Sequence, residues 1–326
     1  MKKDKSVIVI VSLVLINVLF IAGIIALRLR IPQRAIRKIQ SRLDNSVTIQ
    51  EEKVDIENLD KPFNIIYLAD THVVLCDDRD EDVREKSDTR YLEFIVDSKS
   101  SDENFTQTMK YIRESKPDLV IFGGDILDSA TYEAIEFLQK ELDSLDCPYI
   151  YLTGNHDFEY GLEYFSDVAY SEYLPRLINI TDIDKGYELM EFDSFVVLAL
   201  DDAGNQLTPD VTEGIKKAEE TGKPVIVATH VPFVPFEEKD ALVQKSNEVW
   251  GGMDSGDSRT LMGYGGIMPN GDTQEMIKFI AKDDSPVKLV LSGHVHFYHK
   301  DLLNRDIYQV ITGAGYQRNL LKITLY

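Results

Sequence analysis

The stretch Leu-Val-Ile-Phe-Gly-Gly-Asp-Ile-Leu-Asp, residues 119–128, joins an apolar run to a glycine pair and two carboxylates. Its four apolar residues predict a short buried strand, which ends at the glycine pair. Two carboxylates, Asp125 and Asp128, follow directly. In α/β sheets, ligands bind beyond the carboxyl ends of the strands. We therefore expect these two side chains to lie at a functional edge of a sheet.

Six further apolar runs predict strands of the same kind: Phe63–Ala69, Tyr149–Leu152, Phe195–Leu200, Val225–Ala228, Val287–Leu291 and Ile307–Ile311. Between several of them, apolar residues recur on one face of a helical pattern, at Asn104–Lys116, Thr131–Leu145 and Thr273–Lys282. Strands that alternate with helices indicate an α/β domain in which helices cover a mixed sheet.

Five of the six histidines follow predicted strands directly. They lie in Asp70-Thr71-His72, Gly154-Asn155-His156-Asp157, Thr229-His230 and Gly293-His294-Val295-His296. A single His or Asp after a strand is more often a turn or cap residue than a ligand. Clusters that take up nearly every histidine indicate one shared site. The sixth histidine, His299, falls outside the pattern and is expected to be an ordinary surface residue.

Imidazoles and carboxylates together are ligands for divalent Zn, Mn or Fe. The strand-end clusters contain more of these side chains than one ion can bind, and enough for two. A pair of divalent ions can bind one phosphate, activate the attacking water and stabilise the charge that develops on oxygen.

The motif order Asp-x-His, Gly-Asp-x-x-Asp, Gly-Asn-His-Asp, His and Gly-His-x-His resembles the calcineurin-like metallophosphoesterase superfamily, over about Phe63 to Tyr326. The resemblance implies a four-layer α/β/β/α sandwich. It also implies a phosphohydrolase that cleaves phosphomonoesters or phosphodiesters by a metal-activated hydroxide. By the same resemblance, Asp70, His72 and His296 hold one metal ion, Asn155, His230 and His294 hold the other, and Asp125 bridges them. His156 would contact the scissile phosphate or protonate the leaving group, and Asp128 would orient His156.

The chain also departs from branches of that superfamily. Ser129-Ala130 stands where protein Ser/Thr phosphatases have Arg-Gly, which disfavours a phosphoprotein substrate. Phe297-Tyr298 replaces the Gly-Gly-Gln of one lipid-associated branch. Asp201-Asp202 also follows a strand but has no place in the ligand set, so a cap or turn is expected there. A catalytically silent metal-binding scaffold of the same fold is the alternative to an enzyme.

Charge is unevenly distributed along the 326 residues. The net charge is -21, but residues 1–42 carry +8, so the remainder carries -29. A domain so acidic argues against a nucleic-acid polymer as partner. A small phosphate ester, such as a nucleotide or a lipid phosphate, is compatible because two metal ions would make the site locally positive. The two cysteines, Cys76 and Cys147, cannot form a disulfide framework or a Cys-rich zinc site.

Residues Val7–Leu27 contain no charged side chain and predict one transmembrane helix, because a helix of that length is about 30 Å long. A cleaved signal peptide is the alternative. The predicted organisation is a membrane anchor at 1–30, a juxtamembrane linker at 31–60 and a catalytic domain at 61–326. The sequence leaves the side of the membrane open.

Two segments do not fit the strand and helix pattern. Asp77–Asp102 is crowded with charge and predicts a solvated insertion. Gly251–Asp272 is rich in glycine, with Trp250, Met253, Tyr264 and Met268 near or within it. It is either a lid or substrate wall or a plain surface excursion.

Overall fold

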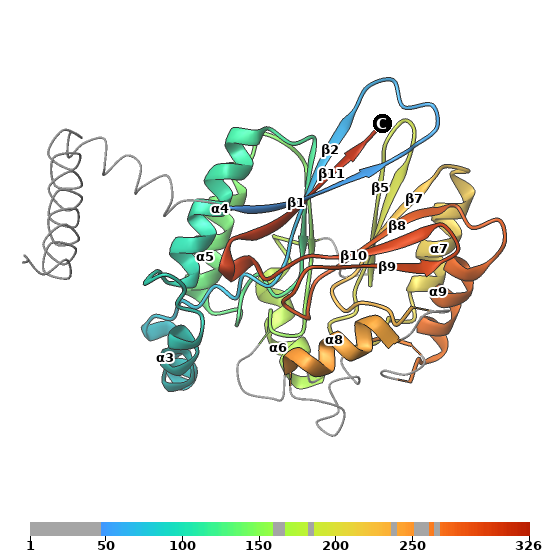
Figure 1. Cartoon of the computed structure of the whole chain (residues 1–326). Helices are drawn as coiled ribbons and strands as arrows, with labels where there is room; N and C mark the ends of the chain where they lie inside the picture. Colours follow the sequence, from blue (N-terminus) through green and yellow to red (C-terminus); the bar gives the residue numbers. More distant parts are fainter. Residues whose placement is uncertain (1–46, 159–166, 182–185, 236–239, 251–260, 264–267) are drawn as a thin grey trace, which may run out of the picture. The chain divides into compact units, whose positions relative to one another are not determined.

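Two β-sheets form the centre of the protein in a computed structural model (Figure 1), which describes residues 47–158, 167–181, 186–235, 240–250, 261–263 and 268–326. Within this part, the first sheet has the strand order β1-β11-β2-β3-β4 and the second β5-β6-β7-β8-β10-β9. The strands of the first are β1 (Thr48–Val54), β2 (Phe63–Leu68), β3 (Leu119–Gly123), β4 (Tyr149–Leu152) and β11 (Asn319–Leu325). Those of the second are β5 (Tyr187–Glu191), β6 (Val196–Leu200), β7 (Val225–Ala228), β8 (Val287–Ser292), β9 (His299–Asn304) and β10 (Ile307–Ile311).

Both sheets are mixed. Strands β2, β3 and β4 are parallel, whereas β11 runs antiparallel to β2 and parallel to β1. In the second sheet β6, β7, β8 and β10 are parallel, and the edge strands β5 and β9 are antiparallel to their neighbours. Each sheet therefore has a parallel centre, whose strands end at the same edge.

Side chains of the two sheets meet face to face, because successive side chains of a strand point to opposite faces. In β2, Ile65 and Tyr67 belong to a buried cluster that also holds Val197 and Ala199 of β6. The neighbouring residues Ile66 and Leu68 instead pack toward helices. Strands that are buried on both faces explain why these segments are continuous apolar runs.

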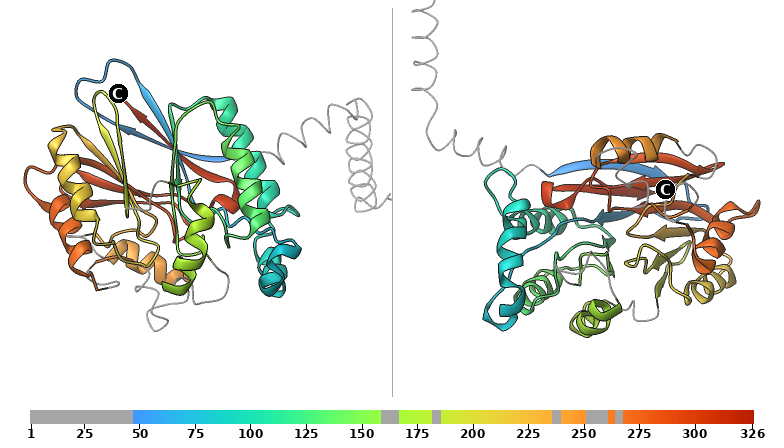
Figure 2. Two further views of the ribbon diagram at one scale, coloured as in Figure 1. Left: turned by 180° about the vertical axis from the view of Figure 1, so that it is seen from behind. Right: turned by 90° about the horizontal axis from the view of Figure 1, so that it is seen from below.

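Helices cover the outer faces. Helices α4 (Ser101–Ser115) and α5 (Tyr132–Leu142) lie on the first sheet, and α7 (Val211–Glu220) and α9 (Gly271–Ala281) on the second, on opposite sides of the protein (Figures 1 and 2). This gives the order helix, sheet, sheet, helix. The remaining helices are α3 (Arg84–Glu93), α6 (Asp167–Leu177) and α8 (Asp240–Trp250), with short 3-10 helices at η1 (Asp78–Val83) and η5 (Gly315–Gln317).

Helix α4 illustrates how the sequence sets an element. Ser100 and Glu103 form a capping box at its start, which satisfies backbone N–H groups that have no partner within the helix. Phe105, Met109 and Ile112 are fully buried against the first sheet. The helix ends at Lys116, which adopts a left-handed conformation just before Pro117.

The seven predicted strands are confirmed within one residue at each end, as are the three predicted helices within about three. The prediction of a linker over residues 31–60 is wrong in part. Thr48–Val54 forms strand β1, which pairs along its length with β11. Its sequence, Thr-Ile-Gln-Glu-Glu-Lys-Val, is charged and half-exposed, as suits an edge strand. The compact unit accordingly begins at Val47.

The predicted membrane span Val7–Leu27 lies outside the described residues. Among the residues that the structure does describe, no helix has the length and apolarity needed to cross a bilayer.

Candidate metal centre

The loops that follow the parallel strands meet at one edge of the two sheets. Backbone hydrogen bonds continue between them beyond the strand ends. Asp70 N donates to Gly124 O at 3.0 Å, His72 N to Asp125 O at 2.9 Å, and Gly293 N to His230 O at 2.9 Å. These bonds hold four of the five strand-end motifs against one another in two pairs.

The backbone at this edge is conformationally unusual. Asp70, His72, Asp125, His294 and His296 all have positive φ, between 42° and 70°. For a residue other than glycine, this region costs on the order of 1–3 kcal/mol and is retained where the surrounding structure enforces it. Five of the seven predicted metal ligands adopt positive φ. This backbone conformation lowers the stability of the fold but directs their side chains into one place.

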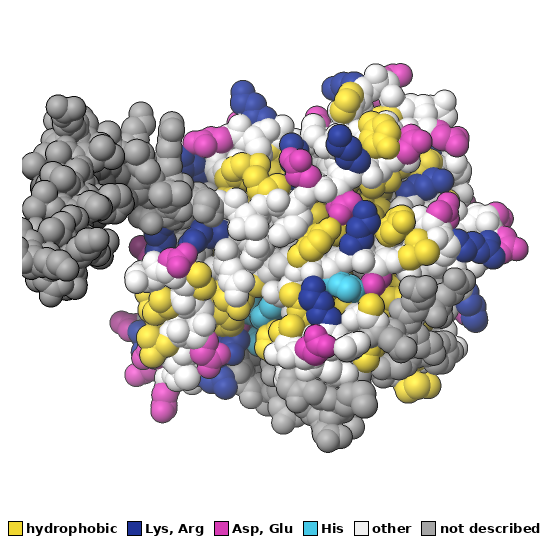
Figure 3. Space-filling view, viewed as in Figure 1, with side chains coloured by type: hydrophobic (Ala, Val, Ile, Leu, Met, Phe, Trp, Pro, Cys, Tyr) yellow, Lys and Arg dark blue, Asp and Glu magenta, His cyan; other side chains and the backbone are white. Residues whose placement is uncertain are grey.

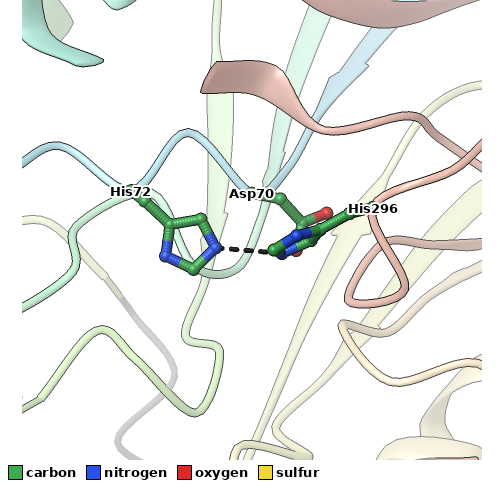
Figure 4. A group of neighbouring side chains, drawn as sticks. All are labelled: Asp70, His72 and His296. Carbon is green, nitrogen blue, oxygen red and sulfur yellow. Dashed lines mark hydrogen bonds and ion pairs between the residues drawn. The ribbon is translucent and has the colours of Figure 1, made fainter. Parts of the chain in front are cut away.

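The first group of candidate ligands is Asp70, His72 and His296 (Figure 4). His72 Nε2 lies 3.1 Å from His296 Nε2, and His296 Nε2 lies 3.5 Å from Asp70 Oδ1. All three side chains are at least four-fifths buried. Three donor atoms of the types that Zn, Mn and Fe prefer therefore converge on one point.

The second group is Asp125, His230 and His294. His230 Nε2 lies 3.1 Å from Asp125 Oδ2 and 3.3 Å from His294 Nδ1. The same Asp125 Oδ2 lies 3.9 Å from His72 Nε2 of the first group. Asp125 thus stands between the two groups.

Asn155 supplies a test of whether a cation fits here. Its Oδ1 is buried, and among the described residues it accepts no hydrogen bond. Buried polar atoms are nearly always paired, so such an acceptor points to a missing cation or donor. The backbone N–H of the next residue, His156, donates to Asp125 Oδ1 at 2.7 Å, which ties this loop to the second group. The residues present therefore fit a metal centre.

Two glycines make this packing possible. A Cβ at Gly154 would lie 2.3 Å from Asp125 Oδ1. A Cβ at Gly124, where φ is +89°, would lie 2.5 Å from His230 Nδ1. Both contacts are shorter than atoms tolerate, so only glycine lets the two loops approach the candidate ligands.

In His72 and His230, a contact at Nδ1 determines that Nε2 is the ring nitrogen that faces the candidate metal site. His230 Nδ1 lies 2.8 Å from Gly123 O, and His72 Nδ1 lies 2.8 Å from Asp128 Oδ1. Both contacts direct Nε2 toward the centre, which is the usual way that outer partners orient a ligating imidazole. Asp128 also lies 3.2 Å from His156 Nδ1 and so contacts two histidines at once.

Asp157 and Asp202 organise the loops behind these residues, a role that the sequence did not indicate. The Asp157 carboxylate accepts hydrogen bonds from Asp125 N, Leu127 N, Gly154 N and the Tyr151 hydroxyl. Asp202 accepts from His230 N at 2.9 Å and Val231 N at 2.8 Å. Burial raises the pKa of each carboxyl to about 7, and Asp125 adds to the effect on Asp157. Asp201, in agreement with the predicted turn, accepts from Ala203 N.

The ionisable side chains of the centre shift one another's pKa values. Burial alone would lower the pKa of His230, but the Asp125 carboxylate outweighs it and raises that pKa to about 10. Burial, reinforced by His230, lowers the pKa of His294 to about 3. Burial also opposes protonation of His156, yet Asp125 and Asp128 raise its pKa. In the metal-free protein, a proton on His230 balances part of the negative charge.

The charged insertion at Asp77–Asp102 is not fully solvated, and that prediction is wrong in part. Asp80 is buried and accepts hydrogen bonds from Tyr132 N and Arg176 Nη1, both at 2.7 Å. Arg90 of α3 forms an ion pair with the buried Asp128. The ring of Phe94 stacks on His72 with 4.4 Å between centroids. The sequence did not indicate these roles, because the patterns of this segment are dominated by exposed charge.

Aromatic side chains also surround the first group. The rings of Trp250 and Tyr316 lie 5.2 Å and 5.6 Å from the ring of His296. Most of the predicted lid or substrate wall at Gly251–Asp272, including Met253 and Tyr264, lies outside the described residues. His299 belongs to neither group of candidate ligands. Its Nε2 lies 2.8 Å from Asp301 Oδ1 and its side chain is only 15% exposed, so the prediction of an ordinary surface residue is wrong. On the face drawn in Figure 3, basic and acidic side chains are interspersed, and histidines are visible between them.

Two mixed sheets thus carry, at the ends of their parallel strands, two groups of histidine and carboxylate side chains that suit divalent cations. The calcineurin-like phosphoesterase family model matches residues 63–298, and the chain belongs to that family.

Individual relatives are distant. The chain is 25% identical over 190 residues to an uncharacterized metallophosphoesterase of Helicobacter pylori, covering 56% of this chain and 42% of that protein. It is 33% identical over 98 residues to a 3′,5′-cyclic-nucleotide phosphodiesterase of Nostoc sp., covering 29% of this chain and 31% of that protein. The alignments thus span less than half the length of these relatives. A solved dimetal phosphatase from Danio rerio aligns with 81% of this chain and 93% of its own, at 13% identity and a TM-score of 0.47.

Proposed function

We propose that this protein hydrolyses small phosphodiesters or phosphomonoesters with two divalent cations, of Mn, Fe or Zn, held by the seven residues named above. The observation that carries the proposal is the position of Asp125 Oδ2, 3.1 Å from His230 Nε2 and 3.9 Å from His72 Nε2. A carboxylate shared between two groups of imidazoles is the arrangement that a pair of cations requires. When bound, such cations supply an activated water and neutralise charge on the phosphate.

The remaining chemistry belongs to side chains of this chain. His156 is the proton donor to the leaving oxygen, because its Nδ1 faces Asp128 and its Nε2 is therefore on the opposite side of the ring. Asp128 fixes the ring and favours its protonated form. Asp157 and Asp202 hold the loops that carry Asp125, Asn155 and His230.

Diesters are the first substrates to test. The Nostoc relative is named for cleavage of a cyclic-nucleotide diester, which makes a nucleotide diester a reasonable candidate for this chain. The charge of -29 beyond residue 42 supports a small substrate over a long polyanion, which would be repelled outside the centre. We retain lipid phosphates as a second class, since the predicted anchor at Val7–Leu27 would hold the domain near a bilayer.

The test is hydrolysis of bis(p-nitrophenyl) phosphate and p-nitrophenyl phosphate, with Mn, Fe or Zn added to metal-free protein. We expect activity on both esters that is abolished in Asp125→Asn. In His156→Gln, hydrolysis of methyl phenyl phosphate, whose leaving oxygen needs a proton, should fall at least about a hundredfold. His299→Gln is the matched control, since His299 pairs with Asp301 away from the centre, and it should be unaffected.

The competing function is a scaffold that binds metal without turnover. Metal analysis alone does not separate the two, because both predict bound metal. Stoichiometric metal together with no hydrolysis of mononucleotides, cyclic nucleotides, lipid phosphates or the two nitrophenyl esters would favour the scaffold. The complete set of ligands, with the proton donor His156 also present, supports the enzyme.

A further inference from the structure

Arg90 joins helix α3 to the candidate active site. It lies in the last turn of that helix, and its guanidinium meets the carboxylate of Asp128 with two parallel hydrogen bonds. Nε donates to Oδ2 and Nη2 donates to Oδ1, each at 2.7 Å. Asp128 is fully buried and the Arg90 side chain is 18% exposed. A bidentate pair of this kind fixes both the position and the plane of a carboxylate.

The Asp128 carboxylate is itself the support of two histidines. Its Oδ1 lies 2.8 Å from His72 Nδ1 and 3.2 Å from His156 Nδ1. Rotation of the carboxylate by a fraction of a turn would move Oδ1 away from one ring or the other. Because Arg90 holds both oxygens, it prevents that rotation. The guanidinium also reaches His156 directly, with Nη2 at 3.5 Å from Nδ1.

A second contact from the same turn strengthens the connection. The Arg90 guanidinium lies 4.8 Å over the ring of Phe94, and Phe94 stacks on His72 at an interplanar angle of 6°. Arg90 Nη1 donates to Glu93 at 2.6 Å. The end of α3 therefore touches both the ring of a candidate ligand and the carboxylate behind it. Nε and Nη2 of Arg90 donate to Asp128, and Nη1 donates to Glu93. Because these donors bind carboxylates of the protein, we infer that Arg90 acts through Asp128.

We propose that Arg90 is a positioning residue, which locks Asp128 so that His156 delivers its proton to the leaving oxygen, and that α3 is thereby part of the active site. This inference rests on the proposed function. In the reaction, the oxygen of water bonds to phosphorus, one proton of that water passes to solvent, and the bond from phosphorus to the leaving oxygen breaks. His156 gives that oxygen its proton and later regains one from solvent.

The test compares two esters that share a methyl group and differ in the leaving group, methyl p-nitrophenyl phosphate and methyl phenyl phosphate. p-Nitrophenolate is a stable anion and leaves with little help from a proton, whereas phenolate depends on one. We expect Arg90→Ala to lower kcat for the phenyl ester about tenfold more than for the nitrophenyl ester. KM should change less than about threefold, since Arg90 acts in the transition state. Arg90→Lys should restore part of the loss.

The matched control is Arg84→Ala on the same helix. Within the described residues, the one ion pair of Arg84 is with Asp78, which is fully exposed. Arg84→Ala should leave both esters unaffected. An equal loss for the two esters in Arg90→Ala would mean that Arg90 is merely structural, and no loss for either would mean that it has no role. Either result overturns the proposal. Arg90→Gln, which keeps most of the volume, replaces Arg90→Ala if the latter fails to fold.

A second measurement separates this inference from the proposed function. In metal-free protein, the Nδ1 resonance of His156, assigned by comparison with His156→Gln, should shift in Arg90→Ala and remain in place in Arg84→Ala. The shift is expected even if no ester is hydrolysed, because it reports the surroundings of the ring and needs no substrate. An unchanged His156 resonance in Arg90→Ala would overturn the positioning role whatever the activity.

Discussion

Asp125 and His230 form a fully buried ion pair, with Asp125 Oδ2 3.1 Å from His230 Nε2. In the metal-free protein the imidazolium takes the place of a cation beside the carboxylate, and Asp125 raises the pKa of His230 to about 10 against the opposing effect of burial. The same Nε2 must lose its proton to become a ligand. Metal binding and deprotonation are therefore coupled at this residue.

We predict that metal binding releases about one proton from His230 at any pH below about 10. Apparent metal affinity should rise roughly tenfold per pH unit from this residue alone, because the protonated form prevails below its pKa. His294, whose pKa burial lowers to about 3, is already neutral and adds nothing. Release is measured with a pH indicator in weakly buffered solution at pH 8 as Mn²⁺ is added.

His299→Gln serves as the control for this experiment and should release protons as the wild type does. His230→Asn should release about one proton fewer, because the side chain that carries this proton is gone. Equal release in His230→Asn and wild type would contradict the prediction.

The second prediction concerns Asn155, whose buried Oδ1 accepts no hydrogen bond from the described residues. An unpaired buried acceptor costs roughly 1–3 kcal/mol, so Asn155→Ala should not destabilise the metal-free protein by the loss of that atom. With metal present, the variant should unfold at lower urea concentration than wild type and bind one ion at least about tenfold more weakly. Asn155→Asp, which keeps an oxygen in place, should retain metal. Equal losses of stability with and without metal would argue against a ligand role.

The sequence predicted the strands that are buried on both faces, because a continuous run of Val, Ile, Leu and Phe such as Leu119–Phe122 is typical of a strand covered on both sides. It missed the edge strands β1, β5 and β9, whose polar and half-exposed residues alternate with only a few apolar ones. It also missed β11, where Lys322 and Thr324 interrupt the apolar pattern.

For the site, the motifs sufficed to bring the candidate ligands together, since the carboxyl ends of parallel strands share one edge. Arg90, Asp157 and Asp202 could not be found in this way. Arg90 lies 38 residues from Asp128 on a helix whose own pattern is polar. Asp202 acts on the backbone of His230, 28 residues further along. Such roles depend on which loops pack together, and no local pattern records that.

The third prediction is a pH dependence of stability at Asp202. Burial raises the pKa of its carboxyl to about 7, above the value near 4 of an unfolded chain. The folded state therefore binds the proton more tightly, and the stability due to this group is present below about pH 4 and is lost as pH rises toward 7. The free energy of unfolding of metal-free wild type, relative to Asp202→Asn, should fall over that range. This difference in the free energy of unfolding should fall by about 1.4 kcal/mol per pH unit.

Urea unfolding at pH 5, 6, 7 and 8 measures this difference. Asp78→Asn is a suitable control, because Asp78 is fully exposed and its ion pair is with Arg84, which does not titrate over this range. Parallel curves for wild type and Asp202→Asn would show that the Asp202 carboxyl keeps an ordinary pKa in the folded protein.

The last prediction tests how far one carboxylate determines the geometry of the centre. Asp157 Oδ2 accepts from Asp125 N at 2.8 Å and Gly154 N at 2.7 Å, while Oδ1 accepts from Leu127 N and the Tyr151 hydroxyl, both at 2.8 Å. In Asp157→Asn the amide NH₂ must face at least one backbone N–H, whichever way the amide is turned. The amide NH₂ and a backbone N–H, both hydrogen-bond donors, would then face each other in a buried site.

We expect Asp157→Asn to lower the free energy of unfolding by about 3 kcal/mol and to weaken metal binding, since the Asp125 loop loses its anchor. Tyr151→Phe removes only one of the four donors and should cost about 1 kcal/mol without loss of metal. Urea unfolding and metal analysis of both variants give the comparison. If Asp157→Asn were as stable and as fully loaded as Tyr151→Phe, the backbone of the Asp125 loop would have to be held by the strands β3 and β4 alone.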